Sequence, residues 1–245
     1  MLEGPDLVAA ALEAGAAVEA VYFEAVAATP ERPACAAALA LAVARGVRLI
    51  ELDTGVLARV ADAVTPQPVL AVAAMPDTGL DQVPGDGFVL VLHDVRDPGN
   101  LGTAVRAADA SGAAAVVVSG QSVDVFNPKG LRATAGSAFH LPLAIAGTLD
   151  EAVAALHGTA RDVLGAVVRG GDPLWHVPMT SRTAVVVGGE SSGLDAGERG
   201  LLDGVVTIEM EGRAESLNVG VAAALVCFEA LRRRRGPRDA TAPTI

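Results

Sequence analysis

Aromatic side chains are scarce in this chain, since phenylalanine, tyrosine and tryptophan together make up 3% of its 245 residues. Proteins that recognise single-stranded RNA commonly stack its bases on such rings. No stacking platform is evident here, so any recognition of RNA has to rely on backbone and shape. Trp175, which follows Asp172 and Pro173, is interpreted as a packing anchor in a loop.

Cysteine is also rare, with two residues, Cys35 and Cys227. Their spacing matches neither a redox motif nor a zinc motif. Both lie among Ala, Leu and Val, which is typical of buried thiols. No paired His and Cys spacing suits a metal ion, and we therefore expect none in this protein.

Two phosphate-binding motifs are missing from the sequence. A Gly-x-Gly-x-x-Gly turn after a strand would indicate a dinucleotide enzyme, and a Gly-x-x-x-x-Gly-Lys-Ser/Thr loop a nucleotidase; neither occurs. No uninterrupted apolar run reaches membrane-spanning length, and no early stretch has the pattern of a cleaved signal. We expect a cytoplasmic protein whose chemistry depends on Asn, Arg, Glu and Ser.

Basic residues are outnumbered, and the formal net charge is −11. This balance disfavours a polyanionic partner, because nucleic-acid affinity comes largely from Lys and Arg that neutralise phosphates. The charge is uneven: residues 1–80 carry −6 (4 basic, 10 acidic), 81–231 carry −9 (9 and 18) and 232–245 carry +4 (5 and 1). The arginines at 232–235 and Arg238 either reach phosphate or form a solvated helix end, which the helix dipole favours.

The first third of the chain alternates helical and extended patterns. Helices are expected at 5–15, 33–45 and 55–64, and strands at 18–23, 47–52 and 69–73. This pattern predicts a small α/β domain over residues 1–80, and 51% apolar content is ample for its core. The stretch 75–87 is rich in Pro, Gly and Asp without periodicity, which places a linker at 81–87.

Strand and helix patterns alternate again over residues 88–235. Strands are expected at 88–93, 114–119, 141–145, 163–168, 183–188 and 205–209, and helices at 101–111, 129–138, 149–157, 196–202 and 217–235. Such alternation predicts a parallel sheet with helices on both faces. Thr148 with Glu151 is expected to form a capping box, Asp195 to cap the next helix, and residues 236–245 to be disordered.

Three polar signatures each follow a predicted strand. They are Asp97-Pro98-Gly99-Asn100-Leu101-Gly102 with Arg106 four residues on, Gly188-Gly189-Glu190-Ser191-Ser192-Gly193-Leu194, and Glu215-Ser216-Leu217-Asn218-Val219. Open α/β sheets bind ligands beyond the carboxyl ends of their strands. The three loops are therefore predicted to form one site.

These signatures resemble, in order and spacing, the three motifs of the SpoU (TrmH-like) RNA 2′-O-ribose methyltransferases of the SPOUT superfamily. The stretch 127–137, Asn-Pro-Lys-Gly-Leu-Arg-Ala-Thr-Ala-Gly-Ser, is similar to the segment that the family carries between its first two motifs. The resemblance covers residues 88–235. Residues 1–80 are similar, more loosely, to the L30e-like substrate-binding domain of members that act on ribosomal RNA.

The resemblance implies a trefoil-knotted α/β catalytic domain, S-adenosylmethionine as cofactor, and a homodimer whose paired subunits complete the active site. It places the cofactor against Val187, Gly188, Gly189, Glu190, Gly193, Ile208, Met210, Ser216 and Leu217. The glycines would let backbone groups approach the adenine and ribose, and Ile208 and Leu217 would supply apolar walls.

The implied reaction is an in-line attack of a ribose 2′-hydroxyl on a sulfonium methyl group, which a cation near the developing alkoxide assists. Arg106 occupies the family position for that role. Because a guanidinium almost never loses its proton in proteins, stabilisation of phosphate and alkoxide is favoured over action as a general base. Asn100 is expected to hold Arg106 or the ribose, and Glu190, Ser216 and Asn218 to orient the arginine and the nucleotide.

Lys129 and Arg132 are the expected phosphate contacts, and large-subunit ribosomal RNA is the expected substrate. Transfer RNA is the alternative substrate, and a non-catalytic RNA- or ribosome-binding protein or a small-molecule methyltransferase are the alternative classes. The predicted helix 217–235 is apolar nearly all round. It is either buried in its own subunit or shared with a dimer partner, and the resemblance favours the partner.

Overall fold

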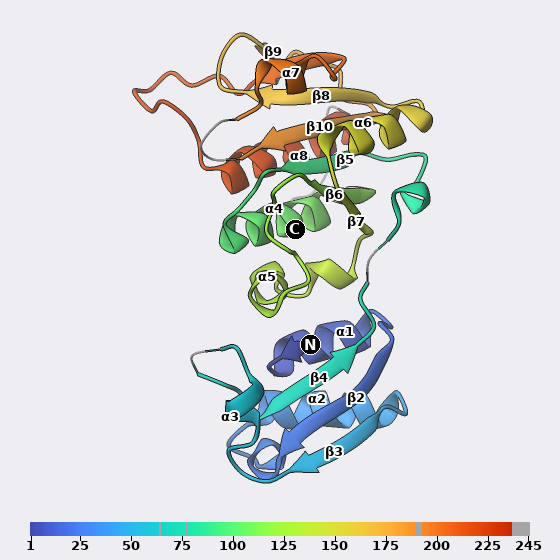
Figure 1. The fold of residues 1–245 in the computed structure, drawn as a ribbon, viewed down its shortest axis with the longest axis vertical. Helices are drawn as coiled ribbons and strands as arrows, with labels where there is room; N and C mark the ends of the chain where they lie inside the picture. The colour runs from blue at the N-terminus through green and yellow to red at the C-terminus, as the bar shows by residue number, and fades with distance from the viewer. Residues whose placement is uncertain (64, 77, 190–192, 237–245) are drawn as a thin grey trace, which may run out of the picture. The chain divides into compact units, whose positions relative to one another are not determined.

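The computed structural model describes residues 1–63, 65–76, 78–189 and 193–236. The chain forms two compact units (Figure 1). Unit 1 comprises Met1–Pro76 and Asp124–His140, and unit 2 comprises the rest of the described chain. The segment Asp124–His140 falls in the stretch for which the sequence pattern predicts the second domain. Residues 237–245, expected to be disordered, lie outside the described residues.

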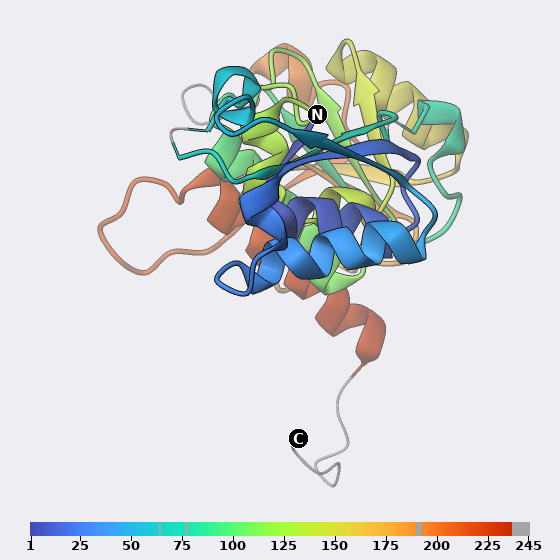
Figure 2. The ribbon, with the colours of Figure 1, turned by 90° about the horizontal axis from the view of Figure 1, so that it is seen from below.

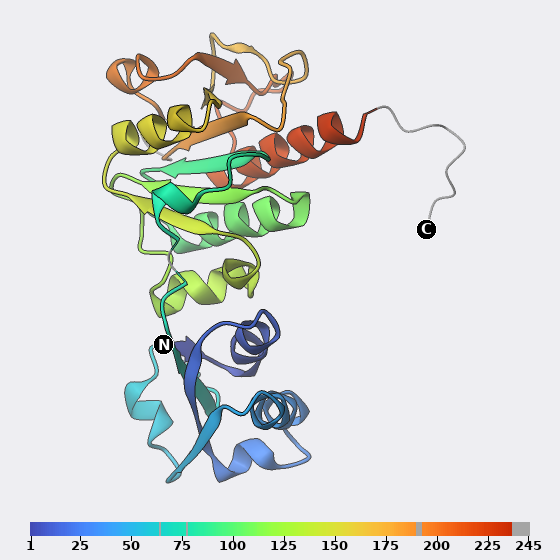
Figure 3. The ribbon, with the colours of Figure 1, turned by 90° about the vertical axis from the view of Figure 1, so that its right-hand side faces the viewer.

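Unit 1 contains a four-stranded sheet in the order β1-β4-β2-β3. Its strands are β1 (Leu2–Glu3), β2 (Val18–Glu24), β3 (Arg48–Leu52) and β4 (Val69–Ala73). β2 and β3 are parallel, whereas β4 runs antiparallel to both β1 and β2. Figures 2 and 3 show α1 (Pro5–Glu13) and α2 (Pro33–Ala44) side by side on one face of this sheet. The predicted small α/β domain is confirmed, and the two-residue β1 has too short a pattern to predict.

Two helices assigned to unit 1 are shorter than the sequence pattern predicts. α3 spans Leu57–Val60, because Ala61 is already extended, with φ −73° and ψ 143°. α5 spans Pro128–Thr134 and stops where Ala135 and Gly136 both adopt positive φ, 48° and 93°. Two successive left-handed residues cannot continue a right-handed helix.

Unit 2 contains a seven-stranded sheet in the order β7-β6-β5-β10-β8-β11-β9. Its strands are β5 (Val89–His93), β6 (Ala115–Ser119), β7 (Leu143–Ala146), β8 (Asp162–Val167), β9 (Asp172–Pro173), β10 (Thr183–Gly188) and β11 (Gly204–Thr207). Every neighbouring pair is parallel. Central strands such as Val89–His93 are apolar and buried along their length, as expected for a sheet that is covered on both faces.

Helices cover both faces of the unit 2 sheet. Figure 3 shows α4 (Pro98–Ser111) and α8 (Val219–Arg235) on one face and α6 (Leu149–Gly158) on the other. The predicted doubly covered parallel sheet is thus confirmed. The predicted capping box at Thr148 with Glu151 is present. The predicted cap at Asp195 is also present and forms a box with Glu198, although α7 spans only Ala196–Arg199.

Helix α8 buries one face and exposes the other. Val226 and Cys227 are fully buried, whereas Val221 and Phe228 are 46% and 48% exposed. Burial raises the pKa of the Cys227 thiol to about 12, so the thiol stays protonated at neutral pH. Cys35 is buried as well, and the expectation of buried cysteines is confirmed.

The arginines at the end of α8 are engaged within unit 2. Arg232 and Arg233 both pair with the buried carboxylate of Glu229, with N–O distances of 2.6 and 2.8 Å. Arg233 also donates to the Trp175 carbonyl, and Arg234 donates to the carbonyls of Ser111 and Gly112 at the end of α4. Three of the four arginines are therefore engaged, and two of them, Arg233 and Arg234, join the end of α8 to neighbouring segments, which favours the helix-end interpretation of this basic run.

Replacement of Glu229 by Gln is expected to destabilise the protein by about 1–3 kcal/mol at pH 7, because the charged hydrogen bonds to two arginines are lost. Burial acts to raise the pKa of Glu229, but hydrogen bonds and charges from Arg232 and Arg233 outweigh it and lower the pKa below the ordinary 4.5. The stabilisation should therefore be complete above about pH 4.5 and fade as the pH falls through the lowered pKa. Urea unfolding at pH 7 and pH 3 measures this difference, with the exposed Glu211→Gln as control.

Candidate active site

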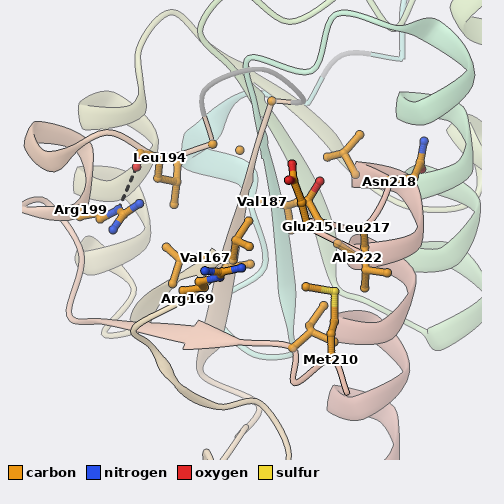
Figure 4. Close-up of a pocket in the computed structure, with 18 residues that line it drawn as sticks. Val167, Arg169, Val187, Leu194, Arg199, Met210, Glu215, Leu217, Asn218 and Ala222 are labelled. Carbon is orange, nitrogen blue, oxygen red and sulfur yellow. Dashed lines mark hydrogen bonds between the residues drawn. The ribbon is translucent and has the colours of Figure 1, made fainter. Parts of the chain in front are cut away.

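A cavity of about 680 Å³ lies at the carboxyl ends of three neighbouring strands of unit 2. Its wall is formed by the end of β8 and the residues after it, by the end of β10 with Gly193 and Leu194, and by the segment 208–219 with Ala222 of α8. Figure 4 shows these side chains around the cavity. Its size is in the range that encloses a small organic ligand.

Most of the residues expected to bind a cofactor lie in this wall. Val187, Gly188, Gly189, Gly193, Ile208, Met210, Ser216 and Leu217 all line the cavity. Glu190, the ninth expected residue and also an expected catalytic one, lies outside the described residues. The structure thus brings together two segments of chain that are some twenty residues apart in the sequence.

Glycine is required at two positions of the wall because backbone packs directly against them. A Cβ atom on Gly188 would lie 2.7 Å from the carbonyl carbon of Gly193, and one on Gly189 would collide with the carbonyl of Asp94. Gly193 has a positive φ of 59°. The close approach of backbone segments at these glycines therefore fixes the shape of this part of the wall.

The first and third signatures meet through two asparagines that are 118 residues apart. Asn218 caps α8, since its Oδ1 accepts hydrogen bonds from the amides of Gly220 and Val221 at 2.9 and 3.3 Å. Its Nδ2 is then left to donate, and it does so to Oδ1 of Asn100 at 2.9 Å. The cap on α8 thus fixes the orientation of the Asn100 amide, which turns its Nδ2 away from Asn218.

Arg106 is exposed and lies outside the wall of the cavity. It follows Asn100 by six residues on α4, a rotation of about 240° around the helix axis, so the two side chains leave the helix on different faces. Within one protomer, the described residues therefore bring Ser216 and Asn218 to the cavity and Asn100 to Asn218, but not Arg106.

The two expected RNA contacts lie on α5 of unit 1. Lys129 is exposed. Arg132 forms an ion pair with the buried carboxylate of Glu3 and a second one with Asp62 at 3.6 Å. Its charge is therefore balanced inside the unit, a pairing across 129 residues that the sequence pattern did not reveal.

A buried histidine ties the cavity wall to the centre of the sheet. His93, at the end of β5, lies 2.8 Å from Oε1 of Glu198 through Nε2 and 3.0 Å from Oγ of Ser119 through Nδ1. Because a carboxylate only accepts, Nε2 carries the proton and, in the neutral ring, Nδ1 accepts from the hydroxyl. Glu198 belongs to α7, next to Leu194 of the wall. No local sequence signal links these residues.

Three ionisable side chains in the wall, Arg169, Arg199 and Glu215, had no role assigned from the sequence, although Glu215 belongs to the third signature. Arg199 donates from Nε to the carbonyl of Leu194 at 2.8 Å. Arg169 could have been noticed in the sequence, since it directly follows a predicted strand, as the three signatures do.

Across the residues that the structure describes, no group of His, Cys, Asp and Glu is suited to hold a metal ion. In the same part of the chain, no helix combines the length and apolar character needed to span a bilayer.

A parallel sheet with a glycine-walled cavity at its carboxyl edge places unit 2 in the class of α/β proteins that bind nucleotide-like ligands at that edge. Residues 87–228 match the SpoU rRNA Methylase family, and the chain belongs to this family. Residues 1–71 match the MRM3-like substrate binding domain. The resemblance inferred from the motifs, including a substrate-binding domain at the amino end, is confirmed.

Several relatives of known activity are similar over most of the chain. The 23S rRNA (guanosine(2553)-2′-O)-methyltransferase RlmP of Bacillus subtilis is 37% identical over 75% of this chain and 72% of its own length. The 23S rRNA (uridine(2479)-2′-O)-methyltransferase of Streptomyces viridochromogenes is 37% identical over 73% of this chain and 64% of its own length. An AdoMet-bound rRNA methyltransferase from Sinorhizobium meliloti has a similar structure, with a TM-score of 0.79, 29% identity and coverage of 95% of this chain and 86% of its own.

Proposed function

We propose that this protein transfers a methyl group from S-adenosylmethionine to a ribose 2′-hydroxyl of RNA, with large-subunit ribosomal RNA as substrate. The observation that carries the proposal is the cavity at the carboxyl ends of β8, β10 and β11, whose wall contains eight of the nine residues expected to bind the cofactor. The named relatives act on 23S rRNA, which supports the substrate. A cytoplasmic location follows from that substrate.

The residues present fit S-adenosylmethionine. Gly188 and Gly189 leave no room for a Cβ atom and offer backbone amides and carbonyls to an adenosine, while Ile208 and Leu217 offer apolar surface. The bound cofactor supplies an electrophilic methyl group. Asn218 and Asn100 orient the nucleotide through their shared hydrogen bond, and Ser216 lines the same cavity.

The catalytic cation in this proposal is Arg106 of a second copy of the chain. Arg106 is exposed on α4, and the neighbouring α8 exposes an apolar stripe that includes Val221 and Phe228 at 46% and 48%. Burial of such a stripe in a homodimer removes apolar surface from water. The dimer then places the arginine of one protomer at the cavity of its partner. The trefoil knot that the family resemblance implies belongs to the same proposal.

Contact with RNA involves Lys129, the one lysine in the sequence. Replacement of Lys129 by Gln is expected to weaken RNA binding and to reduce the slope of log K against log salt by about one, because one phosphate contact is lost. Arg182→Gln, at the amino end of β10, is the matched control that should leave the slope unchanged. A fluorescence-anisotropy titration at several salt concentrations measures both, and equal slopes for wild type and Lys129→Gln would remove Lys129 from the RNA surface.

The proposed function is tested by incubating the protein with tritiated S-adenosylmethionine and purified RNAs. We expect label in unmodified 23S rRNA, and little in 16S rRNA or transfer RNA. Label in transfer RNA alone would show that transfer RNA, and not 23S rRNA, is the substrate. Tight binding of 23S rRNA without transfer of label would support the non-catalytic alternative.

A further inference from the structure

Two oppositely charged side chains enter the cavity from different parts of its wall. Arg169 follows β8, and Glu215 lies in the segment that leads to Asn218. Figure 4 shows Arg169 beside Val167 and Glu215 near Leu217. Both residues are exposed, so their charged groups are accessible to a ligand in the cavity.

Neither side chain is engaged by another residue of the described chain. Among the residues that the structure describes, Arg169 and Glu215 take part in no side-chain hydrogen bond or ion pair, with each other or with any other residue. Arg199, the other cation in the wall, differs, because its Nε is engaged by the Leu194 carbonyl. An arginine and a glutamate kept unpaired in one cavity are suited to a ligand that carries charges of both signs.

The proposed cofactor is such a ligand. Its adenosine part is matched by the glycines and apolar side chains of the wall, but its aminoacyl end carries an α-carboxylate and an α-ammonium group, for which that apolar part has no partner. A guanidinium binds a carboxylate with two parallel hydrogen bonds, and a carboxylate accepts from an ammonium group.

We infer that Arg169 binds the α-carboxylate of S-adenosylmethionine and that Glu215 faces its α-ammonium group. This inference rests on the proposed function, since it assigns two further cofactor-binding residues to the same cavity. It predicts that the protein distinguishes complete cofactor from adenosine thioethers whose aminoacyl end is altered.

The test compares the dissociation constants of S-adenosylhomocysteine, of its carboxyl methyl ester and of its deaminated analogue, by displacement of tritiated S-adenosylhomocysteine. Wild-type protein is expected to bind the acid at least tenfold more tightly than the ester. In Arg169→Ala the acid should lose about ten- to a hundredfold in affinity and the ester less than twofold, so that the preference disappears. Glu215→Gln should likewise abolish the preference for the amino group over the deaminated analogue.

Arg213→Ala is the matched control, since Arg213 lies in the same exposed segment but outside the cavity wall. It should leave all three affinities unchanged. An equal loss of affinity for acid and ester in Arg169→Ala would overturn the inference, because Arg169 would then only shape the cavity. Unchanged cofactor affinity with weakened RNA binding would overturn it too and make Arg169 a phosphate contact. Failure of the proposed function is distinct, because wild-type protein would then bind no S-adenosylhomocysteine.

Discussion

Arg106→Ala should slow methyl transfer about ten- to a hundredfold while leaving the affinity for S-adenosylhomocysteine unchanged. Arg106 is exposed and outside the cavity wall, so its loss disturbs neither the core nor the cofactor pocket. A charge-assisted hydrogen bond to the developing alkoxide contributes about 1.5–3 kcal/mol, which corresponds to this range of rates. Single-turnover transfer to 23S rRNA measures the rate, and Arg106→Lys should recover part of it because the charge remains.

A mixing experiment shows from which protomer the arginine comes. Leu217→Trp fills the cavity and should abolish cofactor binding. Co-refolded with Arg106→Ala, it forms mixed dimers in which one site combines an intact cavity with an intact Arg106. Activity in the mixture well above that of either variant alone would support a shared site. Mixed dimers without activity would show that the whole site lies in one protomer. A fully active Arg106→Ala protein would show that Arg106 has no catalytic role.

Asn218→Asp should preserve the stability of the fold but lower the transfer rate by at least tenfold. Aspartate caps a helix as well as asparagine does, so the bonds from the amides of Gly220 and Val221 remain. The new carboxylate cannot donate to Oδ1 of Asn100, and the Asn100 amide has to turn over. The group that Asn100 presents to the nucleotide then changes from a donor to an acceptor.

Asn218→Ala separates the two roles of this side chain. It removes both the cap and the contact to Asn100. It should therefore lower the free energy of unfolding by about 1 kcal/mol and also lower the rate of methyl transfer. Urea unfolding and single-turnover transfer distinguish the variants. A stable and fully active Asn218→Asp protein would show that the orientation of Asn100 is irrelevant to the reaction.

Much of the fold could be predicted because its determinants are local. Strands such as Val89–His93 and Thr183–Gly188 are continuous apolar runs, and the capping boxes at Thr148 and Asp195 have fixed spacing. The convergence of the second and third signatures also followed from one rule, since parallel strands share a carboxyl edge. The two-residue strands β1 and β9 were not predicted, because their pairing depends on partners far along the chain.

The site was less predictable wherever it depends on long-range pairing. No spacing rule joins Arg132 to Glu3, or His93 to Glu198, which are 129 and 105 residues apart. The exposed position of Arg106 depends on which face of α4 packs against α8. Glu229, by contrast, pairs with Arg232 and Arg233 at the local helical spacings of three and four residues, and only its burial depends on how α8 packs.

In the function that we propose, the loops at this sheet edge direct a methyl group to a ribose oxygen of large-subunit RNA. Nucleoside mass spectrometry of 23S rRNA, digested after reaction with deuterated-methyl S-adenosylmethionine, tests it most directly. We predict a single nucleoside that carries the label on its 2′-oxygen. A label on a base, or no labelled nucleoside from protein that binds both cofactor and RNA, would contradict the account.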